Sequence, residues 1–144
     1  MIGKIFNDQT ITILRKALDA ASLRHQVLSD NIANVNTPGF KRSDVVFQQE
    51  LKNAINESSD DKQFPGLANT NPRHFTGITS NSIDDVMPKV IMQNDTVSRN
   101  DLNNVDIDLE MSKLAENTIL YSALAQITSL RLNSLKSAIN EGRK

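Results

Sequence analysis

Few side chains in this sequence could do chemistry, and their spacing does not assemble a catalytic set. His25 and His74 are its two histidines, and it has no cysteine. A histidine-activated nucleophile needs both groups within hydrogen-bond reach, and no nucleophile elbow is present. No second ligand lies three or four residues from either histidine, which disfavours a metal site. We therefore predict that the protein is not an enzyme and has no catalytic, cofactor or metal site.

The run of residues 101–106 has the superficial look of a calcium loop, and its details exclude one. It lacks the glycine at the sixth position, and Ser112 stands where such a loop places its bidentate glutamate. A glycine-rich phosphate loop is also missing. The sequence therefore directs attention away from ligand chemistry and toward the helices that dominate the chain.

Length and composition exclude several function classes. The chain has 144 residues, enough for one domain, and its net charge is -1. With 4% aromatic residues and no tryptophan, neither charge nor stacking surface favours nucleic acid. No apolar run approaches the ~20 residues of a membrane-spanning helix. The N-terminus lacks a basic region followed by a long apolar run, so we expect no cleavable signal peptide.

The most specific local pattern is the stretch 30–41, Asp-Asn-Ile-Ala-Asn-Val-Asn-Thr-Pro-Gly-Phe-Lys. Asn34 suits a helix end because its short amide readily bonds the neighbouring backbone. Pro38 and Gly39 predict a type II turn, since proline presets one φ and glycine supplies the positive φ that follows. Phe40 then places an aromatic ring just past the turn. Taken by itself, this local pattern is equally consistent with an ordinary helix end followed by a turn.

Residues 10–35 are predicted to form an amphipathic helix. Its apolar seam steps by four and three residues, as in a coiled coil, through Leu14, Leu18, Ala21, His25, Leu28, Ile32 and Val35. Because His25 lies on this apolar arc, we predict that it is buried or at the rim and satisfied by a hydrogen bond.

Residues 105–140 are predicted to form a second, longer helix with acidic residues at its start. One seam steps by four and three through Ile107, Met111, Leu114, Thr118, Tyr121, Ala125, Thr128, Leu132, Leu135 and Ile139. A second apolar set comprises Leu109, Ile119, Leu120, Leu124, Ile127 and Leu130. Together the two sets cover well over half of the helix surface.

The fold class predicted is mainly α, with the two long helices packed as a coiled-coil-like pair. Residues 1–36 and 105–144 would form a discontinuous helical assembly domain, and 37–104 a middle region, mostly irregular, with short strands. We expect 56–62 to be a loop, turns at 64–67 and 71–72, and an edge strand within 86–91 because Pro88 cannot pair centrally. Residues 95–97 are at most extended. The terminal residues 1–9 either fray or dock onto a neighbour through Ile2, Ile5 and Phe6.

The second apolar set of the long helix has no partner in a two-helix hairpin. Leaving six large aliphatic side chains in water forgoes on the order of 10 kcal/mol, which rivals the stability of a small domain. Either the middle region covers this face, or other chains do. Because the middle region is polar and rich in turns, we favour other chains.

Several stretches resemble the bacterial flagellar rod and hook proteins, the axial proteins. The first is 31–41; the others are 71–75 (Asn-Pro-Arg-His-Phe), 98–106 (Ser-Arg-Asn-Asp-Leu-Asn-Asn-Val-Asp) and Glu110-Met111 with Leu114-Ala115 and Asn117. Their order and spacing agree along essentially all 144 residues, and the short middle is similar to that of proximal rod subunits. Leu102 departs from the family, which usually has glycine there, and this argues against a tight glycine turn.

The resemblance implies a structural subunit of the flagellar basal body rod, in the periplasmic space, exported by the flagellar type III apparatus without a cleavable signal. It implies as partners further copies and other rod proteins, the adaptor FliE and the flagellar export gate. The alternatives are a soluble coiled-coil adaptor or secretion chaperone and, far behind, a small all-α enzyme.

The helix seams and the turn are the predicted interaction sites. On the first helix the residues are Leu14, Leu18, Ala21, Leu28 and Ile32, facing Leu114, Tyr121, Leu132 and Leu135 of the same subunit or a neighbour. Leu120, Leu124, Ile127 and Leu130 are predicted to seal one subunit to the next. Asn34, Pro38, Gly39 and Phe40 would set the angle at which the middle region leaves the helices.

Overall fold

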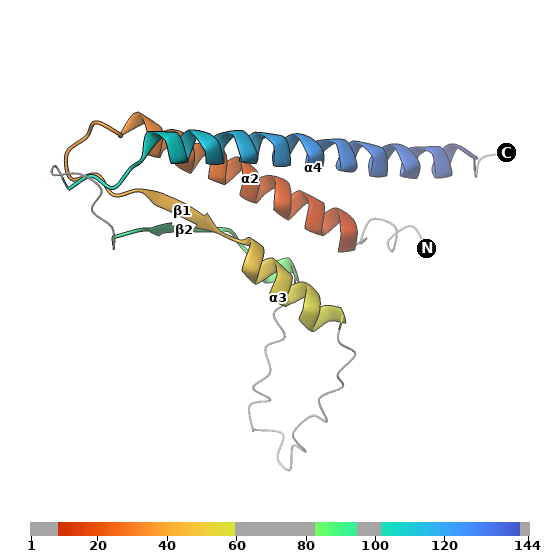
Figure 1. The fold of residues 1–144 in the computed structure, drawn as a ribbon. Coiled ribbons are helices and arrows are strands. Elements are labelled where there is room, and N and C mark those ends of the chain that lie inside the picture. The colour runs from red at the N-terminus through yellow and green to blue at the C-terminus, as the bar shows by residue number, and fades with distance from the viewer. Residues whose placement is uncertain (1–8, 60–82, 95–101, 142–144) are drawn as a thin grey trace, which may run out of the picture. The chain divides into compact units, whose positions relative to one another are not determined.

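The computed structural model describes residues 9–59, 83–94 and 102–141. Their elements in chain order are α2 (Gln9–Ala33), β1 (Ser43–Val46), α3 (Gln48–Ser59), the 3-10 turn η1 (Ile83–Asp85), β2 (Lys89–Met92) and α4 (Ile107–Glu141) (Figure 1). This confirms the mainly α fold with long N- and C-terminal helices and a short β element between them. The chain divides into two compact units, with boundaries after Val46 and after Val86.

The helices α2 and α4 pack side by side and antiparallel, as two hydrogen bonds far apart along the pair show (Figure 1). Asn31 near the end of α2 bonds Glu110 near the start of α4, and Asn117 bonds the carbonyl of Ala21. Leu14, Ala21 and Leu28 of α2 are buried at sevenfold spacing. Both predicted helices are confirmed, with ends shifted by one or two residues.

The last turns of α4 extend past the first described residues of α2 (Figure 1). In the antiparallel register, Gln9 lies level with roughly residue 130 of α4. Residues 132–141 therefore project beyond the described part of α2. Within them Leu132 is 52% and Ile139 61% exposed.

A two-stranded antiparallel sheet lies in the same unit as the helix pair. Ser43 pairs with Met92 and Val46 with Lys89. Val45 is buried and β1 contacts α2, whereas all four residues of β2 are exposed. The predicted edge strand is thus confirmed, and it begins directly after Pro88.

The sequence prediction is wrong for part of the second unit. Residues 56–59 were expected in a loop and belong to helix α3. The apolar residues 45–55 fit no single period because they divide between a strand and a helix. Phe47, Ala54, Ile83 and Val86 are buried, and α3 contacts η1.

Several sequence predictions lie outside the described residues. These are the docking of Ile2, Ile5 and Phe6, the loop at 60–62, the turns at 64–67 and 71–72, the role of His74 and the extended segment 95–97.

Candidate functional site

The turn after α2 has the predicted conformation. Gly39 has φ +72°, and the amide of Phe40 donates to the carbonyl of Thr37 at 3.3 Å, which closes a type II turn. The side-chain amide of Asn34 donates to the carbonyl of Asp30, and the Thr37 hydroxyl donates to Asn34 Oδ1. Asn34 thus terminates the helix as its chemistry predicts, although α2 ends at Ala33 rather than 35.

Asn103 holds this turn from the other end of the chain. Its side chain is fully buried, and Nδ2 approaches the carbonyls of Asn34, Val35 and Thr37 at 2.9–3.1 Å. Its Oδ1 accepts from the amide of Val105 at 2.7 Å. Asn103 therefore bonds backbone groups of the turn, 66 to 69 positions before it in sequence, and a backbone amide at the approach to α4.

Leu102 brings Asn103 into position through a left-handed backbone. Its φ is +65°, and its carbonyl accepts from the Lys41 ammonium at 2.8 Å. Although the family's usual glycine is absent, Leu102 adopts the left-handed conformation that favours glycine. Its side chain is 59% exposed, so little burial compensates for the strain.

We expect Leu102→Gly to raise the free energy of unfolding by about 0.5–1 kcal/mol, because relief of the left-handed strain exceeds the added chain entropy of glycine. Urea unfolding followed by circular dichroism measures this. Leu102→Ala, which keeps the Cβ and the strain, is the matched control and should show no gain.

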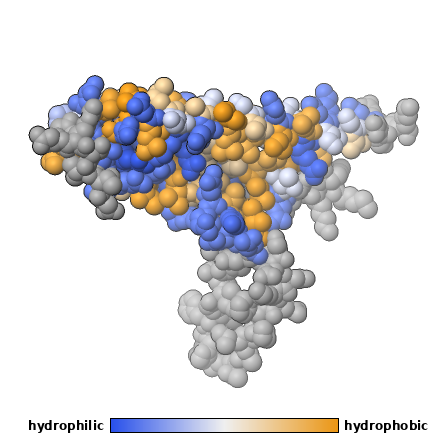
Figure 2. Space-filling view, in the orientation of Figure 1, coloured by the Kyte–Doolittle hydropathy of each residue, from blue (hydrophilic) through white to orange (hydrophobic). Residues whose placement is uncertain are grey.

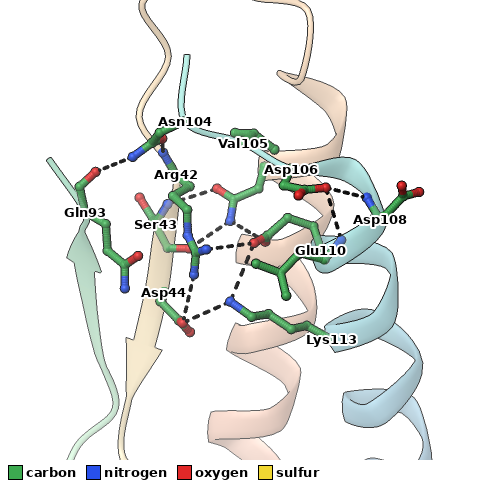
Figure 3. Close-up of polar contacts among 12 residues, drawn as sticks. Arg42, Ser43, Asp44, Gln93, Asn104, Val105, Asp106, Asp108, Glu110 and Lys113 are labelled. Carbon is green, nitrogen blue, oxygen red and sulfur yellow. Dashed lines mark hydrogen bonds and ion pairs between the residues drawn. The ribbon is translucent and has the colours of Figure 1, made fainter. Parts of the chain in front are cut away.

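Two more asparagines join the two-stranded sheet, β1 and β2, to the helices. The Asn31 amide pairs with the backbone of Ser43, donating to its carbonyl at 2.8 Å and accepting from its amide at 3.0 Å. Asn104 accepts from the amide of Arg42 and donates to the carbonyl of Gln93, so it bridges the outer ends of the two strands (Figure 3). Each amide thereby substitutes for a missing backbone partner.

Glu110 is the charged centre of the same cluster. It is fully buried, and its Oε2 accepts from the Asn31 amide at 2.9 Å. Its Oε1 lies 3.5 Å from the Arg42 guanidinium and 3.7 Å from the Lys113 ammonium (Figure 3). Asp44 also contacts both cations. A buried carboxylate held by two cations and an amide ties α2, β1 and α4 into one orientation.

We name this set the polar junction; it comprises Asn31, Arg42, Asp44, Asn103, Asn104, Glu110 and Lys113. Asp106 precedes it as the N-cap of α4, since its Oδ1 accepts from the amides of Asp108 and Leu109. The arrangement carries no nucleophile beside a base. Its chemistry is that of a rigid joint.

Sequence reasoning treated Glu110 as one of the acidic residues that favour the start of the second helix. It quoted Glu110, Asn31, Asn103 and Asn104 otherwise only as part of the resemblance. A signal for part of the junction was present: Glu110, Asn117 and Leu124 are seven residues apart and share one face of α4. Because Glu110 and Asn117 lie on the same helix face as the apolar Leu124, this spacing indicates that the buried face of α4 includes polar residues. Glu110 and Asn117 are indeed buried.

The structure places the predicted interaction residues in different environments. On α2, Leu14, Ala21 and Leu28 are buried, and Leu18 and Ile32 are half-buried. On α4, Leu114, Leu124 and Leu135 are half-buried, whereas Tyr121 and Leu132 are 45% and 52% exposed. Leu120, Ile127 and Leu130 are exposed by 39%, 51% and 70%. In the turn, Asn34 and Phe40 are half-buried, and Pro38 and Gly39 are exposed.

Of the two alternatives predicted for His25, burial is wrong, because its side chain is exposed. The residues of α2 that are buried in the helix pair are spaced seven apart: Leu14, Ala21 and Leu28. His25 lies about 60° around the helix from Leu28, outside the contact.

In the described part of the chain, none of the helices combines the length and apolarity needed to cross a membrane.

Comparisons with known proteins agree on one family. A family model described as "Flagella basal body rod protein" matches residues 11–41, which comprise nearly all of α2 and the turn that follows it. A protein of Borrelia hermsii is 37% identical over 92% of this chain and 96% of its own length. One of Bacillus subtilis is 34% identical over 93% and 95%, and one of Escherichia coli K12 is 25% identical over 99% of each chain. All three carry the name flagellar basal body rod protein FlgB.

Proposed function

Because the chain belongs to the FlgB family of flagellar basal body rod proteins and is a structural subunit of the rod, we propose that it builds the proximal rod by packing α4 against helices of neighbouring subunits. The observation that carries this proposal is the exposed apolar surface of α4. Among the relatives, none of the names suggests the adaptor or chaperone alternative.

One flank of α4 supplies the contact surface. Leu120, Ile127 and Leu130 lie there at spacings of seven and three residues and are exposed by 39%, 51% and 70%. Ile119, exposed by 72%, adds to the apolar area. Apolar residues reach the surface along much of α4 (Figure 2). Covering such side chains contributes ~1.5–3 kcal/mol each, which favours association over a lone subunit.

The polar junction would give the rod its stiffness. A subunit that transmits torque must keep its helices and its two-stranded sheet in one orientation under load. The buried Glu110 pairs and the Asn103 bonds resist rotation because each alternative leaves a buried group unsatisfied. The turn would then fix the direction in which the chain leaves the helix pair. It comprises Asn34, Pro38, Gly39 and Phe40.

The partners in this proposal are further copies, other rod proteins, the adaptor FliE and the flagellar export gate. The remaining seam residues would contact helices of the same or a neighbouring subunit. They are Leu18, Ile32, Leu114, Tyr121, Leu124, Leu132 and Leu135. The proposed location is the rod in the periplasmic space, reached by type III export without a cleaved signal.

Ile127→Asp tests the contact directly. We expect the purified wild-type chain to associate as its concentration rises, and the variant to remain monomeric, because a carboxylate in an apolar contact is costly to bury. Sedimentation velocity over a concentration series measures this. Ile127 suits the test better than the half-buried Leu124, since its exposure spares the fold.

Gln126→Asp is the control, because it introduces the same charge at an exposed polar neighbour. It should associate like the wild type. A wild-type chain that stays monomeric at every concentration, or an Ile127→Asp chain that associates normally, would contradict the proposal.

A further inference from the structure

The face of α4 that packs on α2 continues past the described part of α2. Apart from Lys113, the wholly or partly buried residues of α4 step by four, three or seven positions: Glu110, Leu114, Asn117, Leu124, Thr128 and Leu135. Gln9 lies level with roughly residue 130, so Leu135 has no described residue of α2 opposite it (Figure 1). The seam therefore extends beyond the helix that fills it.

This end of α4 presents apolar side chains on one side. Leu132 and Ile139 are exposed by 52% and 61%, and Leu135 is half-buried. At ~100° per residue, the three lie within about 60° of one another around the helix. We call Leu132, Leu135 and Ile139 the terminal stripe. It is a continuation of the contact between α2 and α4.

The chain that precedes α2 is placed to reach the terminal stripe. Residues 1–8, which lie outside the described residues, read Met-Ile-Gly-Lys-Ile-Phe-Asn-Asp. They join α2 at Gln9, and Ile139 lies about 14 Å further along α4 from the level of Gln9. Eight residues span ~12 Å as a helix and ~26 Å when extended, so either conformation reaches along the stripe.

We propose that residues 1–8 dock on the terminal stripe of their own subunit through their three large apolar side chains, Ile2, Ile5 and Phe6. The same subunit is the partner because the segment is joined to α2 beside the stripe. Such a short connection gives an effective concentration of about millimolar, which exceeds that of other copies in a micromolar solution. Covering apolar surface on both sides favours the contact.

The proposal assigns two parts of α4 to two different contacts. The terminal stripe is covered by the subunit itself. Leu130 of the exposed flank lies about 180° around the helix from Ile139, so that flank stays open to neighbouring subunits. The docking is a property of one subunit and holds whether or not the chain assembles as proposed above.

A cross-linking experiment tests the docking in the full chain, which has no native cysteine. Lys4→Cys lies among the apolar residues of the segment, and Lys136→Cys lies at an exposed position about 60° around α4 from Ile139. The doubly substituted chain is treated with a short bis-maleimide at a concentration where sedimentation shows a monomer. The expected product is an internally cross-linked monomer that migrates faster in denaturing electrophoresis.

Ser137→Cys with Lys4→Cys is the matched control. Ser137 is exposed and lies at nearly the same height on α4, but about 160° around the helix from Ile139. Cross-linking at position 136 should be about ten-fold faster than at 137, because a docked segment lies on one side of the helix. Equal rates would contradict the proposal.

Removing the apolar side chains shows whether they cause the difference. Ile2→Ser combined with Phe6→Ser should make the rates at positions 136 and 137 equal. A difference that persists in this variant would overturn the proposal. So would covalent dimers from a mixture of Lys4→Cys and Lys136→Cys chains in place of the internal product, since they would place the segment on a neighbouring copy.

Hydrogen exchange gives a second readout at the same monomer concentration. Ile2→Ser with Phe6→Ser should speed exchange of the amides of residues 132–141 about five- to ten-fold, because this end of α4 loses its cover and opens more often. The amides of residues 110–124 should be unaffected. Lys4→Ser, a polar change in the same segment, should leave both regions as in the wild type. Unchanged exchange at 132–141 in the double variant would contradict the docking and leave the assembly proposal standing.

Discussion

Replacing Asn103 by alanine should lower the free energy of unfolding by about 1–3 kcal/mol, because the buried amide of Val105 loses its acceptor and a buried group left unpaired costs ~1–3 kcal/mol. The substitution removes an amide that serves the carbonyls of Asn34, Val35 and Thr37, and an oxygen that serves the amide of Val105. Urea unfolding followed by far-UV circular dichroism, at a concentration where the chain is monomeric, measures the loss.

Asn36→Ala is the control for Asn103→Ala. Asn36 lies in the same turn and its side chain is exposed. Its replacement should change stability by no more than ~0.5 kcal/mol. Comparable losses for the two variants would show that composition of the turn matters and that the buried amide does not. Restored stability in Asn103→Asp, which keeps only the acceptor, would locate the effect at Val105.

Replacing Glu110 by alanine should lower the free energy of unfolding by about 3 kcal/mol, the low end for breaking a buried ion pair, because Asp44 still lies 3.5 Å from the Arg42 guanidinium. The side chain of Arg42 is only 11% exposed and would lose its nearest fully buried counter-charge. Asn31 would lose the acceptor at 2.9 Å. Glu110→Gln keeps the shape and an acceptor oxygen, so its loss should be smaller, about 1–3 kcal/mol.

A double-mutant cycle makes the Glu110 prediction specific. Arg42→Met combined with Glu110→Leu removes both charges and should cost less than the two single losses added together. Glu116→Gln on the exposed surface of α4 is the control and should be nearly neutral. Additive single losses would show that the two side chains act independently.

These predictions bear on assembly as well as stability. A subunit with a weakened polar junction can still present the apolar flank of α4, but at variable angles to its two-stranded sheet. We expect Glu110→Gln to reduce the order of assembled particles more than their amount. By contrast, Ile127→Asp should abolish association and leave the fold intact.

Much of the fold could be predicted from residue types and spacing. The four-and-three repeats located both long helices, and Pro38-Gly39 predicted a turn whose φ the structure confirms. The apolar excess of α4 also followed from the sequence. These features are local or periodic, so neighbouring residues encode them without knowledge of distant contacts.

The division of residues 45–59 between strand and helix could not be predicted in this way. The apolar positions there belong to two elements separated by a single residue, Phe47. Short segments of this kind carry too few residues for either period to emerge. Their conformation is set by pairing with β2 and by burial of Ala54 within the second unit.

The sequence by itself determined that this chain has two long helices, one sharp turn and more apolar helix surface than a hairpin can cover. Only the tertiary structure decided which stripe of α4 meets α2 and that Glu110, Asn31 and Asn103 lie buried at the joint. The physical reason is distance along the chain: Asn31 and Glu110 are 79 positions apart. Burial of a polar side chain is favourable only when such a partner is already in place.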